Sequence, residues 1–257
     1  MSTNDRLKNK NVLITGATAG IGKATAFEFA SRDANLILTG RRGEKLKAIA
    51  HEIKEEYSVK VVTAAFDIQS WDACLNFVNN LDQQVDILVN NAGLSRGLDP
   101  IYEGKKEDWD EMIDTNVKGL LALSRLIIPQ MKDRNEGHVI NIGSIAGHEV
   151  YPGGVVYTAT KHAVKAITEA SKRDLHGTKV RVSMVSPGLV ETEFSKVRFH
   201  GDEEKAENVY KGMQALTAQD IAEIIVFTAD RPPHVNIMDT IVLPVDQSSS
   251  TMVHRNE

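Results

Sequence analysis

The chain has 257 residues, of which 42% are hydrophobic and 25% charged, and its net charge of -5 gives no reason to expect a nucleic acid or an anionic membrane as partner. The length suits one large α/β domain. The single cysteine, Cys74, excludes an internal disulfide, fits a reducing compartment and has the spacing of a buried helix residue. The polar first residues and the lack of any stretch near the roughly 18 apolar residues of a spanning helix lead us to expect a cytoplasmic protein.

Short apolar runs alternate with amphipathic helical stretches, which is typical of repeated βαβ units and of a parallel sheet covered on both faces. Strands are expected at residues 12–15, 36–39, 60–66, 87–89, 138–142, 180–185 and 241–243. Helices are expected around residues 16–31, 46–53, 71–81, 109–128, 155–167 and 217–225. Residues 187–213 are polar and irregular, and a polar tail follows from about Gln247. The pattern predicts a single α/β domain over residues 1–257, with a doubly wound parallel seven-stranded sheet and helices on both faces.

A glycine loop joins the first strand to the first helix, with the spacing G-x-x-x-G-x-G at Gly16, Gly20 and Gly22. In this position, backbone N–H groups and the helix N-terminus face a pyrophosphate, so the loop indicates a dinucleotide site. A P-loop is excluded because it needs a glycine at position 17 and a serine or threonine at position 24, where the chain has Ala17 and Ala24. A strand-to-helix turn without a ligand is the structural alternative.

The end of the second strand indicates which dinucleotide the loop would bind. An acidic residue there would accept the ribose 2′-hydroxyl of NAD, whereas basic residues would accommodate the 2′-phosphate of NADP. The chain reads T-G-R-R at residues 39–42, so it places Arg41 and Arg42 there and no carboxylate. Guanidinium groups can bind phosphate oxygens bidentately, and we therefore predict NADP as cofactor. Solvated arginines at a helix start are the alternative interpretation.

Tyr157 and Lys161 lie at an i,i+4 spacing on the helix that is expected to begin at Val155, which puts both side chains on one face. A tyrosine has a pKa of about 10, and a neighbouring ammonium favours the phenolate and is expected to lower that pKa toward the working pH. Ser144 could hold the oxygen that gains or loses the proton. A surface helix with an incidental tyrosine and lysine would have the same spacing, and a serine hydrolase is excluded because G-S-I-A-G is not G-x-S-x-G.

Taken together, the motifs resemble the short-chain dehydrogenase/reductase family in order and approximate spacing over nearly the whole chain. They are T-G-A-T-A-G-I-G at residues 15–22, N-N-A-G at 90–93, an asparagine at 116, and the Ser144, Tyr157 and Lys161 group. The resemblance implies a Rossmann fold and a catalytic tetrad of Asn116, Ser144, Tyr157 and Lys161, in which Asn116 supports a water-linked proton path. Without the resemblance, Asn116 would be interpreted as a helix asparagine bonded to the backbone.

The resemblance also implies the set of residues that bind the cofactor and an assembly of four subunits. The adenine would lie at Asp67 and Ile68, and the nicotinamide under residues 187–195. The cofactor-binding residues are expected to be Gly16, Ala17, Thr18, Ala19, Gly20, Ile21, Gly22, Arg41, Arg42, Asp67, Ile68, Asn91, Ala92, Gly93, Tyr157, Lys161, Pro187, Gly188, Leu189, Val190 and Thr192. The homotetramer would be formed by the helix around residues 109–128 and the helix that carries Tyr157. A stripe of Leu120, Leu123 and Ile127 is equally consistent with burial inside one chain.

The segment at about 188–213 is charged and suited to a lid over the substrate. The strings E-T-E-F-S at 191–195, V-R-F at 197–199 and I-V-L-P-V-D-Q-S at 241–248 resemble the NADP-dependent 3-hydroxy acid dehydrogenases, which include serine and allo-threonine dehydrogenases and malonic semialdehyde reductases. We expect the substrate to contact Ser144, Tyr157 and Arg198. The Arg198 guanidinium would pair with the substrate carboxylate, with a solvated lid arginine or an interface ion pair as the alternative.

Two other functions are compatible with these motifs. One is a short-chain reductase of a different carbonyl compound, such as a 3-oxoacyl thioester or a ketone. The other is a sensor that binds NADP without turnover, although such a protein has no need of a tyrosine and lysine at helical spacing. No metal is expected, because the eight histidines include no H-E-x-x-H pattern and the chain has no cysteine cluster.

Overall fold

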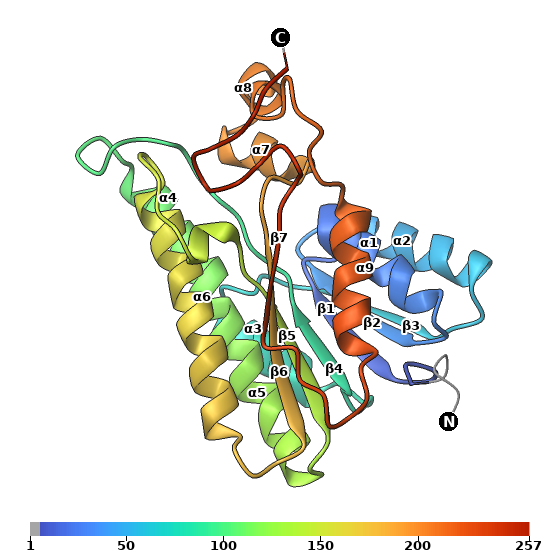
Figure 1. Ribbon diagram of the computed structural model, residues 1–257. Helices are drawn as coiled ribbons and strands as arrows, with labels where there is room; N and C mark the ends of the chain where they lie inside the picture. The colour runs from blue at the N-terminus through green and yellow to red at the C-terminus, as the bar shows by residue number, and fades with distance from the viewer. Residues whose placement is uncertain (1–5, 257) are drawn as a thin grey trace.

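The structure is a computed structural model that describes residues 6–256, and its centre is one seven-stranded parallel sheet (Figure 1). The strands lie in the order β3-β2-β1-β4-β5-β6-β7, so the direction of winding reverses between β1 and β4. The predicted doubly wound α/β fold is confirmed. The strands are β1 (Asn11–Thr15), β2 (Asn35–Gly40), β3 (Val61–Ala65), β4 (Ile87–Asn90), β5 (Gly137–Ile142), β6 (Val180–Pro187) and β7 (Asp239–Val242).

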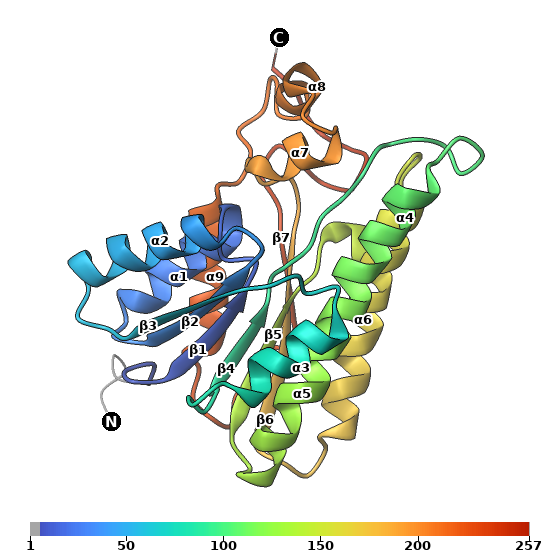
Figure 2. The same ribbon diagram turned by 180° about the vertical axis from the view of Figure 1, so that it is seen from behind.

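Helices cover both faces of this sheet, as the two opposite views show (Figures 1 and 2). Helices α1, α2 and α9 pack on one face of the sheet, and α3, α5 and α6 pack on the other. Helix α4 precedes α5 in the chain and lies beyond its N-terminal end. The helices are α1 (Gly20–Ala30), α2 (Gly43–Glu56), α3 (Trp71–Asn79), α4 (Lys106–Ile113), α5 (Leu120–Asp133), α6 (Val155–Asp174), α7 (Glu193–Arg198), α8 (Glu203–Asn208) and α9 (Ala218–Ala229).

The middle of β1 is apolar at three consecutive positions because the strand is buried on both faces. Val12 and Ile14 of β1 point toward α1 and α9, whereas Leu13 between them points to the other face, where it packs with Ile127 and Met131 of α5. All five side chains have no solvent exposure. Successive strand residues alternate between faces, so a strand enclosed by two helix layers reads as a continuous apolar run rather than as an alternating one.

The prediction that Cys74 is a buried helix residue is confirmed, because Cys74 is fully buried on α3. Helix α9 begins with a capping box, in which the Thr217 side chain accepts from the backbone N–H of Asp220 and the Asp220 carboxylate accepts from that of Thr217. Leu120 and Leu123 are buried within the chain, so their stripe contributes to the core and gives no sign of a subunit interface. No helix within residues 6–256 is both long and apolar enough to cross a bilayer.

The long helix predicted at residues 109–128 is not one α-helix. Helix α4 ends at Ile113, residues Asp114–Gly119 form a π-helical segment, and α5 begins at Leu120. Gly119 closes this segment against Ile68, where an added Cβ would lie only 3.0 Å from the isoleucine side chain. The apolar spacing of the sequence continues through α4, the π-helical segment and α5, so the periodicity did not reveal the wider π-helical turn. Such π-helical turns are frequent at functional sites.

The prediction that residues 187–213 are irregular is wrong in part, because the segment contains α7 and α8. Each helix has six residues, which is too short to leave a periodic pattern in the sequence. Side-chain caps begin both of them: Thr192 Oγ1 accepts from the N–H of Phe194, and Asp202 Oδ1 accepts from the N–H of Lys205. Both helices lie beyond the carboxyl ends of the strands (Figure 1).

Candidate active site

A cavity of about 830 Å³ opens at the carboxyl ends of the strands, next to the point where the strand order reverses. Ligands of open α/β sheets bind in this position. The cavity is lined by the glycine loop, the ends of β2, β4, β5 and β6, the start of α6, the helix α7 and the C-terminal tail. The predicted residues that line it are Gly16, Thr18, Ala19, Gly20, Ile21, Arg41, Arg42, Asp67, Ile68, Asn91, Ala92, Gly93, Ser144, Tyr157, Lys161, Pro187, Gly188, Leu189, Val190, Thr192 and Arg198.

Three predicted site residues do not line the cavity. Two of them, Ala17 and Gly22, contribute to the packing of the glycine loop on the side away from the cavity. Ala17 is fully buried and donates its N–H to the Thr39 carbonyl at 3.0 Å. Gly22 sits at the start of α1, where an added Cβ would lie 2.5 Å from the Gly16 carbonyl oxygen and 2.5 Å from Asn91 Nδ2. The loop therefore needs a glycine at position 22 for close packing within the chain and not for contact with a ligand.

Asn116 is the third residue outside the cavity lining. Its side chain is bonded in both directions to the backbone of Leu94: Oδ1 accepts from the N–H and Nδ2 donates to the carbonyl, each at 2.8 Å. Nδ2 also donates to Thr160 Oγ1 at 3.1 Å. Asn116 is 2% exposed and lies on the π-helical segment. In this structure Asn116 joins the irregular segment after β4 to α6, the helix that carries Tyr157.

Ser144, Tyr157 and Lys161 meet where β5 ends and α6 begins. All three are buried, with 9%, 8% and 6% of their surfaces exposed. Ser144 Oγ accepts from the N–H of Ala146 at 3.1 Å and lies at the start of a short 3-10 turn. Lys161 donates from Nζ to the Ile142 carbonyl at 2.8 Å, and Nζ lies 5.9 Å from the centre of the Tyr157 ring. The i,i+4 spacing does place the two side chains on one face of α6.

The expected lowering of the Tyr157 pKa by Lys161 is wrong for this arrangement. Burial raises the pKa of Tyr157 to about 12, and the Arg198 charge and the Ser144 hydroxyl only partly oppose that rise. Burial also lowers the pKa of Lys161 to about 8. Desolvation disfavours the charged form of both groups and is the largest influence on each pKa.

The two predicted phosphate-binding arginines make polar contacts with different elements around the cavity. Arg42 donates to Thr18 Oγ1 from Nε at 3.0 Å and from Nη2 at 2.8 Å, and its Nη1 lies 2.8 Å from Glu193 Oε2 on α7. Arg41 Nη1 lies 3.7 Å from Glu111 Oε1 on α4. Hydrogen bonding from Arg42 lowers the pKa of Glu193. Both side chains are exposed, Arg41 at 56% and Arg42 at 43%, so solvent screens these contacts.

Arg198 extends from the end of α7 into the cavity and lies against aromatic rings. Its Cζ is 5.1 Å from the centre of the Tyr157 ring and 5.3 Å from that of Phe194, and Nη2 donates to the Tyr151 hydroxyl at 3.2 Å. Its Nε is buried and has no hydrogen-bond partner among residues 6–256. A buried N–H without a partner is costly in a folded protein and is often a sign of a missing ligand.

The C-terminal tail is part of the cavity wall, which the sequence did not reveal. Gln247 is 5% exposed and its Oε1 accepts from the N–H of Leu189 at 2.8 Å. Ser250, Thr251, Val253 and Arg255 line the cavity beyond it. Polar composition alone does not distinguish such a segment from a solvated tail. Among residues 6–256, no group of three or more His, Cys, Asp or Glu side chains is arranged to hold a metal ion.

A parallel sheet with a glycine loop at its reversal point and a tyrosine, lysine and serine at the adjoining strand end defines a dinucleotide-binding protein of the Rossmann type. The chain belongs to the short-chain dehydrogenase/reductase family, because the family profile described as short chain dehydrogenase matches residues 10–203.

Characterised relatives resemble the chain over almost its full length. An NADP-dependent 3-hydroxy acid dehydrogenase of Schizosaccharomyces pombe is 43% identical over 256 residues, covering 98% of this chain and 99% of the relative. One of the same name from Escherichia coli K12 is 45% identical over 249 residues, covering 95% and 99%. Among solved structures, the closed form of serine dehydrogenase complexed with NADP+ has a TM-score of 0.90 at 44% identity, covering 95% of this chain and 99% of that one.

Proposed function

We propose that the chain is an NADP-dependent oxidoreductase acting on CH-OH groups, which transfers a hydride between NADP(H) and a small 3-hydroxy acid and its 3-oxo acid. Serine, allo-threonine and the pair of 3-hydroxypropionate and malonic semialdehyde are the substrates we expect. The names of the relatives support this reaction class. The observation that carries it is the cationic Arg198 over the Tyr157 ring, 5.1 Å from its centre, because this arrangement joins a proton-exchanging hydroxyl to a carboxylate site in one cavity.

The residues of the cavity fit a dinucleotide that carries a 2′-phosphate. Gly16 and Gly20 have φ angles of +65° and +50°, a region that suits glycine and turns backbone N–H groups outward. Arg41 and Arg42 supply cationic donors and the end of β2 has no carboxylate. In this proposal the glycine loop holds the pyrophosphate, the two arginines hold the 2′-phosphate and Asp67 with Ile68 borders the adenine. NADP supplies the hydride chemistry when bound.

In this proposal the catalytic residues exchange the proton, bind the substrate oxygen and position the nicotinamide ribose. Tyr157 exchanges the proton with the substrate oxygen, and its raised pKa keeps it a phenol that can protonate a carbonyl at neutral pH. Ser144 donates a hydrogen bond to the same oxygen, where charge develops. Lys161 holds the ribose hydroxyls beside the nicotinamide, and Asn116 positions the start of the segment after β4 against α6. Bound cofactor would bring its own charges close to Tyr157 and so change the balance that sets its pKa.

The lowered pKa of Lys161 leads to a pH dependence of cofactor affinity. With a pKa of about 8, the ammonium is present below that pH and is lost as the pH rises through it. We expect the Kd of NADPH to increase by roughly threefold to tenfold between about pH 7 and pH 9, since charge-assisted hydrogen bonds are the stronger ones. Fluorescence titration at several pH values measures it. Lys161→Met should bind NADPH more weakly and without an inflection near pH 8, and a flat profile for the unaltered protein would contradict the role of Lys161.

Replacing Arg198 with methionine tests the carboxylate site. A lost charge-assisted pair costs about 1.5–3 kcal/mol, so we expect the KM for 3-hydroxypropionate to rise by roughly tenfold to a hundredfold. The KM for an uncharged alcohol such as 1-propanol should change by less than about twofold. Steady-state kinetics with both alcohols checks this, with Lys196→Met as a matched loss of a cation from α7. An equal rise for both alcohols would remove the proposed contact.

We also propose that residues 188–213 form the substrate lid of a single domain, and that the protein is a cytoplasmic homotetramer. The contacts of Arg42 with Glu193 across the cavity mouth support the lid. Leu121 on α5 and Val155 on α6 are exposed at 44% and 41%, and they lie on the two helices that the family resemblance places between subunits. Sedimentation velocity would measure the assembly, and a monomer at micromolar concentration would argue against it.

A further inference from the structure

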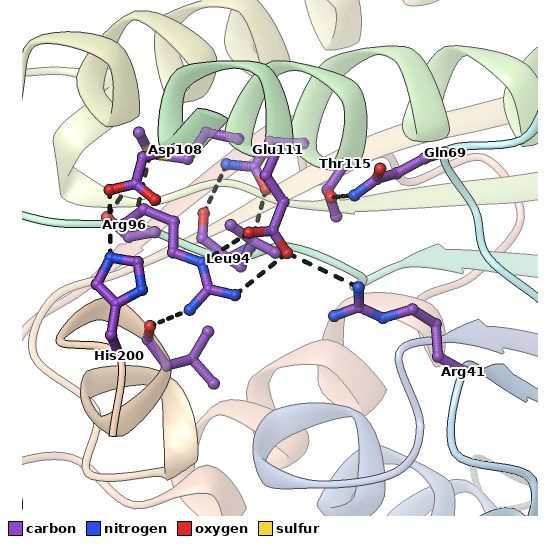
Figure 3. Close-up of polar contacts among 12 residues, drawn as sticks. Arg41, Gln69, Leu94, Arg96, Asp108, Glu111, Thr115 and His200 are labelled. Atoms are coloured by element: carbon purple, nitrogen blue, oxygen red, sulfur yellow. Dashed lines mark hydrogen bonds and ion pairs between the residues drawn. The ribbon is translucent and has the colours of Figure 1, made fainter. Parts of the chain in front are cut away.

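Residues that follow β4 donate hydrogen bonds to the last turn of α7 (Figure 3). Arg96 donates from Nη1 to the Val197 carbonyl at 2.5 Å, and Gly97 donates its backbone N–H to the Arg198 carbonyl at 2.9 Å. The final carbonyls of a helix have no partner within the helix. In α7 the Val197 carbonyl accepts from the N–H of His200 at 3.3 Å and the Lys196 carbonyl from that of Gly201 at 2.8 Å, and Arg96 and Gly97 add two donors from a distant segment to this cap. Gly97 has a φ of +61°, which a glycine adopts without strain.

Arg96 is itself fixed by a two-pronged ion pair with Glu111 of α4. Its Nε lies 2.7 Å from Glu111 Oε2, and its Nη2 lies 3.2 Å from Oε1. The two side chains are 19% and 24% exposed, so water competes little for these bonds. Hydrogen bonding from Arg96 lowers the pKa of Glu111, so the carboxylate is ionised at neutral pH. A bidentate pair leaves the planar guanidinium one orientation, which aims its remaining edge at α7.

Helix α4 makes two further polar contacts around this pair (Figure 3). His200, just beyond α7, places Nε2 at 3.2 Å from Asp108 Oδ2. Arg41, at the cofactor end of the cavity, reaches Glu111 at 3.7 Å. His200 and Arg41 are 49% and 56% exposed, so solvent screens both contacts. Arg96 in the pair with Glu111 is only 19% exposed, so this contact is screened less than the other two.

The position of Arg198 depends on the pair of Arg96 and Glu111, because Arg198 is the last residue of α7 and Arg96 donates to the carbonyl of the residue before it. We infer that Arg96 is a positioning residue: with Glu111 it fixes the last turn of α7 and so holds the Arg198 guanidinium over the ring of Tyr157. The inference rests on the proposed role of Arg198 in carboxylate binding. Without Arg96 the turn would keep only its backbone hydrogen bonds and would be less ordered before the substrate binds, which weakens substrate binding more than it slows the chemical step.

The test combines Arg96→Met with Arg198→Met in a double-mutant cycle. We expect Arg96→Met to raise the KM for 3-hydroxypropionate about tenfold with kcat within about twofold, and to change that KM by less than about twofold once Arg198 is already methionine. Glu111→Gln should act in the same direction, by about threefold. Arg181→Met is the matched control, because Arg181 caps the end of α9 by donating to the Ala229 carbonyl at 2.8 Å, away from the cavity.

Hydrogen–deuterium exchange of peptides covering residues 193–201 gives a second readout that needs no turnover. Faster exchange in Arg96→Met and Glu111→Gln, but not in Arg181→Met, is expected. Unchanged exchange in Arg96→Met, or the same rise in KM with and without Arg198, would overturn the positioning role. Arg198→Met could leave the KM for 3-hydroxypropionate unchanged while Arg96→Met still speeds exchange of residues 193–201. In that case the positioning of α7 by Arg96 stands and the carboxylate role of Arg198 fails.

Discussion

Replacing Tyr157 with phenylalanine is expected to lower kcat for 3-hydroxypropionate oxidation at least about a thousandfold, while the Kd of NADPH stays within about twofold. Proton transfer by a positioned side chain contributes about 10²–10⁴-fold to rate, and removal of the hydroxyl abolishes that transfer. The ring itself packs at 5.7 Å from Phe194, a contact that phenylalanine retains. Stopped-flow or steady-state formation of NADPH measures the first quantity, and fluorescence titration the second.

Tyr57→Phe is the matched control for this change. Tyr57 follows the end of α2, away from the cavity lining, and its loss of a hydroxyl should leave both quantities unaltered. Residual activity of Tyr157→Phe above about one tenth of normal would show that another group moves the proton. If neither the unaltered protein nor the variant turns over any alcohol or carbonyl while both bind NADPH, the protein is a sensor and not an enzyme.

Replacing Arg41 and Arg42 together with methionine is expected to raise the KM for NADP+ roughly a hundredfold or more. Each charge-assisted contact with a phosphate is worth about 1.5–3 kcal/mol, and both arginines line the cavity. The KM for NAD+ should change by less than about threefold, because that cofactor lacks the 2′-phosphate. Steady-state kinetics with each cofactor at saturating 3-hydroxypropionate provides the comparison.

Arg32→Met controls for the general effect of removing positive charge, since Arg32 lies after α1 and is paired with Glu28. It should alter neither KM. A rise of equal size for NADP+ and NAD+ in the double variant would mean that the arginines stabilise the lid through Glu193 and Glu111 rather than recognise the phosphate.

The fold was predictable from the sequence because the signals that define it are local. The apolar runs of β1 and β4, the glycine loop and the tyrosine and lysine of α6 each depend on a few neighbouring residues. Once the strands are parallel, their carboxyl ends meet at one edge, so the loop and Ser144 had to lie near each other. Most of the predicted cofactor residues line one cavity for this reason.

What the sequence could not reveal depends on contacts between distant segments. The pKa of Tyr157 was mispredicted because spacing shows that Lys161 is near but does not show how deeply the ring is buried, and burial decides the result. Helix α7 is held by Arg96, a residue 101 positions away from the Val197 carbonyl that it caps. Gln247 reaches Leu189 across 58 positions, so a polar tail became a cavity wall. No periodic pattern records such pairings.

The most direct measurement is a kinetic comparison of malonic semialdehyde, L-serine, L-allo-threonine and 3-hydroxybutyrate, each with NADP(H) and with NAD(H), beside a 3-oxoacyl thioester and an uncharged ketone. If Arg198 recognises a carboxylate and the two arginines recognise a 2′-phosphate, kcat/KM should be highest for the small acids and at least about tenfold higher with NADP(H). A preference for NAD(H), or faster turnover of the thioester or ketone than of every small acid, would contradict the proposed function.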